Sequence, residues 1–290
     1  MIRDLVSESV LVATIALVAM PLISRRFRMA FHPVELTRYN SATMSTGLSL
    51  LLVALIACAA PVASALLGGS LTDRHFFPGD TIIGWISAIV AITVAASAII
   101  GYRRFRSMEH LLAIEPGLGL HVPRTGYDLV ILPTDQALAY AVSNPHPQVV
   151  ISSGLVEELP VSELVSVIEH EAAHIRLGHR RHLVLAAMME PIAVAVPPAR
   201  RLVDVSRMAL ERAADSATTN YGATRAALLR LSGITPNPGV AAFTAGDVVD
   251  RLDALASTGD QPKKVVRAIL YFSAFALAAT SAAVLSAFWI

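Results

Sequence analysis

The chain has 290 residues, of which 54% are hydrophobic and only 16% are charged, a composition too apolar for an ordinary soluble enzyme. Lys and Arg number 23 against 22 Asp and Glu, so the charge balance gives no reason to expect a direct nucleic-acid partner. The single cysteine, Cys58, excludes an internal disulfide and a thiolate metal cluster.

Four apolar runs approach or exceed the length of about 20 residues that a helix needs to cross a bilayer. They cover residues 5–23, 48–67, 82–100 and 266–290. The first run is interpreted as an anchor and not as a signal peptide, because its basic cluster follows it and no cleavage site stands out. We therefore predict a membrane α-helical protein with four transmembrane helices, in contact with the lipid bilayer of the cell membrane.

Basic clusters predict the orientation of these spans. The clusters at 25–28, 103–106 and 263–267 all fall on one side of the membrane under a single topology. Because positive flanks favour the cytoplasm, the N-terminus is expected outside and the segment after the third span inside.

The predicted domains follow from this topology. A three-span membrane region covers 1–104, a cytoplasmic domain covers 105–265, and the fourth span covers 266–290. The cytoplasmic segment has about 160 residues, which is the size of one domain.

The first part of the cytoplasmic domain has the pattern of a small sheet. Short apolar runs predict strands over 128–132, 137–142 and 148–152, separated by proline-containing turns. From about Pro160 the apolar period becomes helical. The domain is therefore predicted to be mainly α, in an α+β arrangement.

The helices of this domain are predicted from apolar periodicity and from helix breakers. One helix runs from Pro160 to about Met189, where Pro191 and the pair at 197–198 stop it. Within that region, 183–196 is interpreted as a buried or membrane-grazing segment.

Three shorter helices are predicted to follow. They cover about 201–220, 223–232 and 247–256, with Gly222 placed to end the first and a loop over 233–246.

The stretch His170-Glu171-Ala172-Ala173-His174 lies in the first of these helices. Histidines four residues apart project from one helical face and can hold one zinc ion, and Glu171 lies beside them. A chance occurrence of this short motif is the alternative. A catalytic zinc needs a third protein ligand and an open position, so the third ligand decides between the two interpretations.

Two sets of residues compete for this role. His179 and His182 follow on the same predicted helix, where they would point past the metal, so we expect them at the surface or behind the ligands. Glu211 lies on a separate predicted helix that could pack against the first. Asp215, one turn later, could accept a hydrogen bond from a liganding histidine and fix its tautomer.

The pair His170-Glu-x-x-His174 and Glu211-x-x-x-Asp215 resembles the sites of gluzincin membrane peptidases of the HtpX and Oma types, and more closely those of BlaR/MecR-type antirepressor peptidases. The stretch Val149-Val150-Ile151-Ser152-Ser153-Gly154-Leu155 is similar to the strand and turn before the zinc helix in both groups. The four-span topology is similar to that of the BlaR/MecR group. That group carries a penicillin-binding sensor domain after its last span; this sequence ends at Ile290, so no such sensor is expected.

The resemblance implies that His170, His174 and Glu211 bind one Zn²⁺, that Glu171 is the general base and that Asp215 supports a ligand. The strand at Ala139, Tyr140 and Ala141 resembles the edge strand that pairs with an extended substrate, although it could equally be an ordinary strand of the sheet. Tyr221 and Arg225 are candidates for a donor to the developing oxyanion.

The expected activity is a zinc endopeptidase acting on a protein or peptide substrate, with a transcriptional repressor as the regulatory candidate. The alternatives are a quality-control protease of the HtpX kind and a non-catalytic membrane protein that keeps the fold. Intact Glu171 argues against the non-catalytic alternative, which has no need of a general base.

Overall fold

The computed structural model describes most of the chain, with gaps. The described residues are 32–66, 78–115, 117–143, 146–232 and 245–256. The predicted first and fourth spans, 5–23 and 266–290, therefore lie outside the described residues, and so does most of the predicted loop at 233–246.

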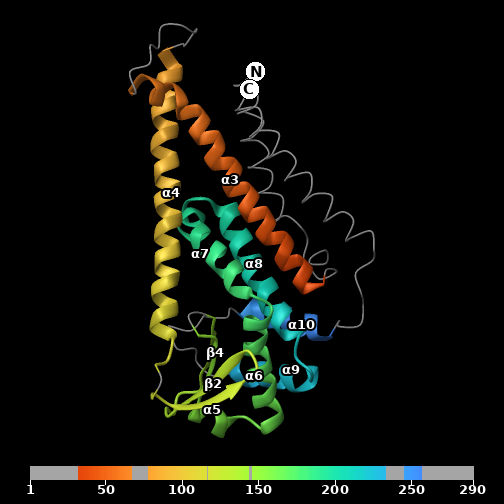
Figure 1. Ribbon diagram of the computed structural model, residues 1–290. Helices are drawn as coiled ribbons and strands as arrows, with labels where there is room; N and C mark the ends of the chain where they lie inside the picture. The colour runs from red at the N-terminus through yellow and green to blue at the C-terminus, as the bar shows by residue number, and fades with distance from the viewer. Residues whose placement is uncertain (1–31, 67–77, 116, 144–145, 233–244, 257–290) are drawn as a thin grey trace.

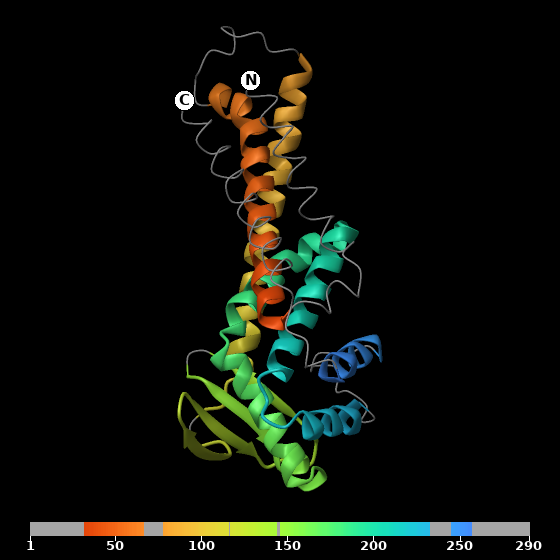
Figure 2. The same cartoon turned by 90° about the vertical axis from the view of Figure 1, so that its right-hand side faces the viewer.

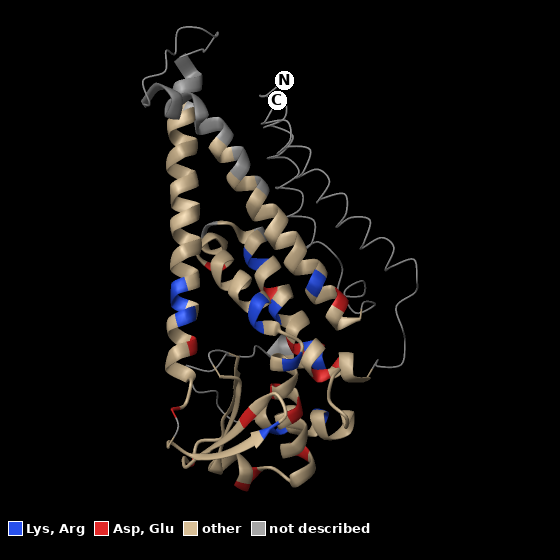
Figure 3. Ribbon diagram, viewed as in Figure 1, with Lys and Arg blue, Asp and Glu red and all other residues tan. Residues whose placement is uncertain are grey.

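Two long helices, α3 (Pro33–Leu66) and α4 (Pro78–Leu112), contact each other and diverge toward the end of the molecule that carries the sheet (Figure 1). Within the described residues, Gly84–Leu112 of α4 is long and apolar enough to cross a membrane, which covers most of the third predicted span. Figure 3 shows Lys and Arg on α4 only near the end close to the sheet, where Arg103, Arg104 and Arg106 lie. The second predicted span falls in the later half of α3, where many side chains lie outside the description.

The predicted helix over 160–189 is not continuous. Helix α6 (Val161–Arg176) ends before Gly178, which has a φ of 65°, and α7 (His179–Ala195) begins immediately afterwards. Glycine adopts this left-handed conformation without the steric cost of a side chain, which explains why the helix breaks there. Apolar periodicity continues across Gly178, so the sequence pattern did not indicate the break in the helix.

Helices α7 and α8 (Pro197–Asp215) form a hairpin that packs between α3 and α4 (Figure 1). The prediction that Pro191 stops the helix was wrong, because Pro191 lies inside α7. The hairpin instead turns at Val196, whose backbone is extended, as the residue before a proline prefers. Pro197 then starts α8, since a first-turn proline loses no helical hydrogen bond.

The segment 183–196, predicted to be buried or membrane-grazing, thus belongs to α7 up to Ala195 and packs on α4. At Gly101 of α4 an added Cβ would lie 2.1 Å from the carbonyl oxygen of Ala187, so only glycine allows this approach. Buried side chains join the hairpin to α3; they include Met44, Met189 and Leu202.

Four strands form a mixed sheet in the order β1-β2-β4-β3. The strands β2 (Tyr127–Leu132), β3 (Ala139–Val142) and β4 (Gln148–Ser152) confirm the three predicted ones. Strand β1 (Leu120–Arg124) was not predicted because it is short and contains Pro123. It lies at an edge of the sheet, where a proline is tolerated.

The sheet supports α6 through a small apolar core. Strand β4 is buried along its whole length, pairs in parallel with β2 and antiparallel with β3, and packs with β3 against α6. Core side chains come from the sheet, the short helix α5 (Ser153–Glu158) and α6; they include Leu129, Val149, Ile151, Leu155 and Ala172. Figure 2 shows α6 lying along the sheet.

The turn between β4 and α5 depends on two small residues. Ser152 caps α5 by accepting a hydrogen bond from the Leu155 amide at 3.1 Å. At Gly154 a Cβ would lie 2.1 Å from the carbonyl oxygen of Asp135, so the close approach of the preceding loop requires glycine.

The last described elements are α9 (Tyr221–Ser232) and α10 (Ala245–Ala256), which pack against each other. Both confirm predicted helices to within two residues at each end. The preceding helix, α8, lies four to five residues earlier than predicted at both ends. Asn220 caps α9 through the Ala223 amide at 3.0 Å, so Gly222 lies inside α9 and does not end α8.

Candidate metal centre

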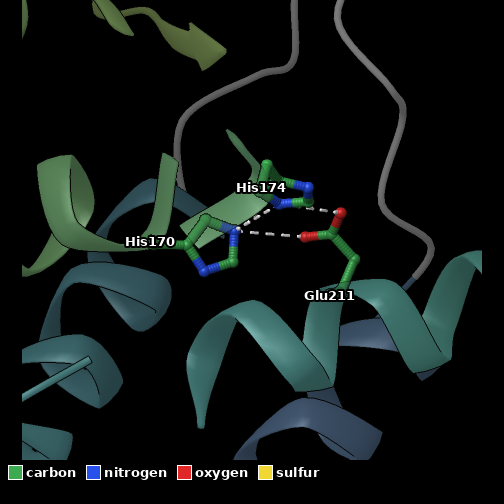
Figure 4. Close-up of side chains that lie close together, drawn as sticks. All are labelled: His170, His174 and Glu211. Atoms are coloured by element: carbon green, nitrogen blue, oxygen red, sulfur yellow. Dashed lines mark hydrogen bonds and ion pairs between the residues drawn. The ribbon is translucent and has the colours of Figure 1, made fainter. Parts of the chain in front are cut away.

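His170 and His174 on α6 lie opposite Glu211 on α8, and the three side chains point toward one another (Figure 4). The Nε2 atoms of the two histidines are 3.3 Å apart. Glu211 places Oε2 at 3.4 Å from His170 Nε2 and Oε1 at 3.7 Å from His174 Nε2. Among the described residues, this is the group of three His, Cys, Asp or Glu side chains that could hold a metal ion.

These separations fit a tetrahedral zinc site. Zinc bonds of about 2.0–2.1 Å at tetrahedral angles place neighbouring ligand atoms about 3.3–3.4 Å apart. The two distances that involve His170 Nε2, 3.3 and 3.4 Å, match this spacing, and the 3.7 Å distance to His174 lies close to it. Two histidines and one glutamate leave a fourth position open, which is the ligand set of a catalytic zinc.

Asp215 lies behind His170. It follows Glu211 by one turn of α8, is 2% exposed, and places Oδ1 at 2.9 Å from His170 Nδ1. The distance is that of a hydrogen bond, although the ring is not aligned for an ideal one. This contact lies on the Nδ1 side of the ring and leaves Nε2 facing His174 and Glu211.

Arg251 of α10 contacts Asp215 and Glu211, and its place in the site was not predicted. Its guanidinium forms two bonds with the carboxylate of Asp215, at 2.7 and 2.8 Å, and lies 3.3 Å from Glu211 Oε2. The side chain is almost fully buried. The sequence showed only that Arg251 lies in a predicted amphipathic helix. The packing of α10 is needed to show that its guanidinium contacts Asp215 and Glu211.

The pKa values of the site reflect this dense set of charges. Burial alone would lower the pKa of His170, but Asp215 and Glu211 outweigh it and raise that pKa to about 10. Burial alone would raise the pKa of both carboxyls. The hydrogen bond from His170 and the charges of His174 and Arg251 instead hold the pKa of Glu211 below its usual range, and the hydrogen bonds from Arg251 and His170 do the same for Asp215.

His174 differs from His170. Burial lowers its pKa, and the charges of Glu211 and Glu171 only partly oppose that effect. Glu171, which is half-buried on α6, lies close enough for its charge to act on His174 and Arg251.

His179 and His182 are both buried, so the surface alternative was wrong for both, whereas the alternative position behind a ligand is found for His179. His179 Nδ1 lies 3.1 Å from His174 Nδ1, on the side of that ring away from Glu211. Burial lowers the pKa of His179 to about 3. His182 forms a hydrogen bond with Ser41 of α3 and does not join the metal group.

The remaining predicted residues lie elsewhere. Strand β3, with Ala139, Tyr140 and Ala141, is an edge of the sheet that packs against α6. Arg225 is exposed on α9, and the Tyr221 hydroxyl donates to the Ser216 carbonyl at 3.4 Å. Among the described interactions, neither side chain contacts the three ligand residues.

Comparison with known families places this geometry in context. Residues 106–233 match the model of peptidase family M48. The match supports an M48-type metallopeptidase domain, and that family is zinc-dependent. The matched region contains the sheet, α6, α8 and all three candidate ligands, whereas Arg251 lies beyond it. The searches of curated proteins and of solved structures found no match.

Proposed function

We propose that this chain is an integral-membrane zinc endopeptidase that cleaves a cytoplasmic or membrane-proximal protein. The observation that carries the proposal is the convergence of His170, His174 and Glu211 from two helices at the spacing of zinc ligands. The match of residues 106–233 to an M48 peptidase model supports it independently.

The side chains around the site have the chemistry that peptide hydrolysis requires. Zinc held in this ligand set supplies Lewis-acid activation of water and of the scissile carbonyl. Glu171 is assigned as the general base that takes a proton from the attacking water and returns it to the leaving amine. Asp215 holds the ring of His170, and Arg251 balances the charge of the carboxylates of Asp215 and Glu211.

Strand β3 is the proposed docking edge for an extended substrate. It ends the sheet order and pairs with β4 on one side, so its other side is an edge on which a peptide could add a strand. It also packs against α6, the helix that carries His170 and His174. A substrate strand paired with Ala139–Val142 would therefore lie near the metal centre.

The membrane location and orientation are part of the proposal. Helix α4 supports one crossing, and its arginines at 103, 104 and 106 come directly before the domain that holds the site. A positive flank at this end favours a cytoplasmic domain, with the N-terminus outside under the four-span topology. We further propose the division into 1–104, 105–265 and 266–290.

Within this class, the four-span topology favours a regulatory protease of the BlaR/MecR kind that cleaves a transcriptional repressor. A quality-control protease of the HtpX kind is the second candidate, because the resemblance of the zinc motifs extends to both groups. The two differ in substrate: one specific DNA-binding protein or a range of damaged membrane proteins.

Substrate trapping tests the proposal. The full-length Glu171→Gln protein in its native membrane should bind zinc but accumulate uncleaved substrate, which mass spectrometry identifies by comparison with the wild type. Glu169→Gln is the matched control, because Glu169 lies on the same helix but bonds to Thr219 at 2.8 Å. The control should cleave as the wild type does. Equal amounts of every cellular protein in wild-type and Glu171→Gln membranes would refute the proposal that the chain is an endopeptidase.

A further inference from the structure

His179 contacts the ring of His174 on the side opposite the metal ligands. The two Nδ1 atoms are 3.1 Å apart, whereas Nε2 of His174 faces His170 and Glu211. The planes of the two rings are nearly perpendicular, at 87°. Each of the two histidines thus has a neighbour at its Nδ1 atom. Asp215 lies beside Nδ1 of His170, and His179 lies beside Nδ1 of His174.

The break between α6 and α7 creates this contact. In a continuous helix, His179 would lie five residues and about 140° of rotation beyond His174, away from its face. The left-handed conformation of Gly178 instead starts a new helix at His179, whose side chain reaches back to His174. His179 is 2% exposed, so water does not compete strongly for this contact.

An ion pair with α4 also fixes the first turn of α7. Arg180, the next residue, forms two bonds with the carboxylate of Glu109 on α4, at 2.7 and 2.9 Å. Glu109 is buried. The position of His179 is therefore set by the glycine turn before it and by the anchored arginine after it.

We propose that His179 is a positioning residue that sets the tautomer and the ring orientation of His174 for metal binding. A histidine that binds a metal through Nε2 carries its proton on Nδ1. That proton has an acceptor in Nδ1 of His179, which then carries its own proton on Nε2. Such partners of liganding histidines raise ligand basicity and restrict ring rotation. This inference rests on the proposed zinc site.

Zinc affinity of the full-length protein in detergent, measured by chelator competition, tests the role. His179→Leu fills a similar volume without an acceptor, and should weaken zinc binding by about 10–100-fold. His179→Asn keeps an acceptor near the position of Nδ1 and should restore much of the affinity. His182→Leu is the matched control, because His182 bonds to Ser41 and not to the site. Its zinc affinity should equal that of the wild type.

Cobalt spectra give a second readout that a purely structural role would not change. The d–d bands of the Co²⁺-loaded protein should shift in His179→Leu and return toward the wild-type bands in His179→Asn. If the leucine variant does not fold, His179→Ala takes its place. Wild-type zinc affinity and spectra in His179→Leu, or equal losses in the leucine and asparagine variants, would overturn the role of His179. No zinc binding by the wild type would instead overturn the metal site itself.

Discussion

Glu109 of α4 and Arg180 of α7 form a two-bond ion pair that joins the candidate membrane helix to the helix beginning beside the metal centre. The side chains are unequal in exposure, 8% for Glu109 and 28% for Arg180. A buried charge left without its partner costs more than an exposed one, because the exposed one regains water.

This asymmetry gives a prediction for thermal unfolding in detergent. Arg180→Met leaves the buried carboxylate alone and should lower the free energy of unfolding by about 2–3 kcal/mol, while Glu109→Gln leaves the more exposed guanidinium and should cost about 1 kcal/mol. The double variant should be more stable than the sum of the two changes implies. Equal losses in the two single variants would contradict this assignment of burial.

Arg251→Met removes the cation that pairs with both Asp215 and Glu211. The buried carboxylate of Asp215 and the half-buried carboxylate of Glu211 then lose a partner, so the metal-free protein should lose about 3–5 kcal/mol of stability. Zinc should raise the unfolding temperature of this variant by more than that of the wild type, because the ion relieves the same repulsion. Arg207→Met is the control, since both side chains of its pair with Glu190 are exposed and the pair should contribute at most about 1 kcal/mol.

Zinc binding should itself stabilise the folded protein. Free zinc at about 100 times its dissociation constant contributes about 2.7 kcal/mol, so removal with a chelator should lower the unfolding temperature. The His170→Ala variant should show no such shift, because it lacks one of the three ligands. A chelator effect of the same size in His170→Ala would mean that zinc acts at another site.

His182 provides a pH-dependent contribution away from the ligands. Burial, reinforced by the charges of Arg181 and Arg38, lowers the pKa of His182 to about 4. Arg181 Nε donates to His182 Nε2 at 3.2 Å, so this nitrogen must stay unprotonated and Nδ1 is left to donate to Ser41.

The unfolded chain takes up this proton near pH 6.5, whereas the folded chain resists it until about pH 4. Stability should therefore be highest above pH 6.5 and fall as the pH drops toward 4, with less change below that. His182→Gln cannot be protonated and should lose less stability over this window in melts at graded pH. An identical pH dependence in wild type and variant would rule out this contribution.

The local sequence was sufficient for the features that depend on short-range patterns. The short apolar runs within 128–152 and the helical period after Pro160 identified three strands and helix α6, because each pattern reports which positions of an element are buried. The spacing of His170 and His174 placed both rings on one helical face, since residues four apart are neighbours on any α-helix. Glu211 and Asp215 were candidates because they lie one turn apart on a separate predicted helix, and the resemblance to a known motif then gave them their expected roles.

Packing decided what these patterns could not. Gly178 breaks the predicted helix, and that break places His179 against His174 and not past it along a continuous axis. Arg251 is distant in sequence from the ligands and reaches them only because α10 packs on α8 and α9. Such contacts form when separate helices pack their apolar faces together. The sequence pattern of one segment therefore does not show which charged side chains come into contact. The sequence alone thus identified the candidate ligands, and the tertiary structure determined the groups that hold them in position.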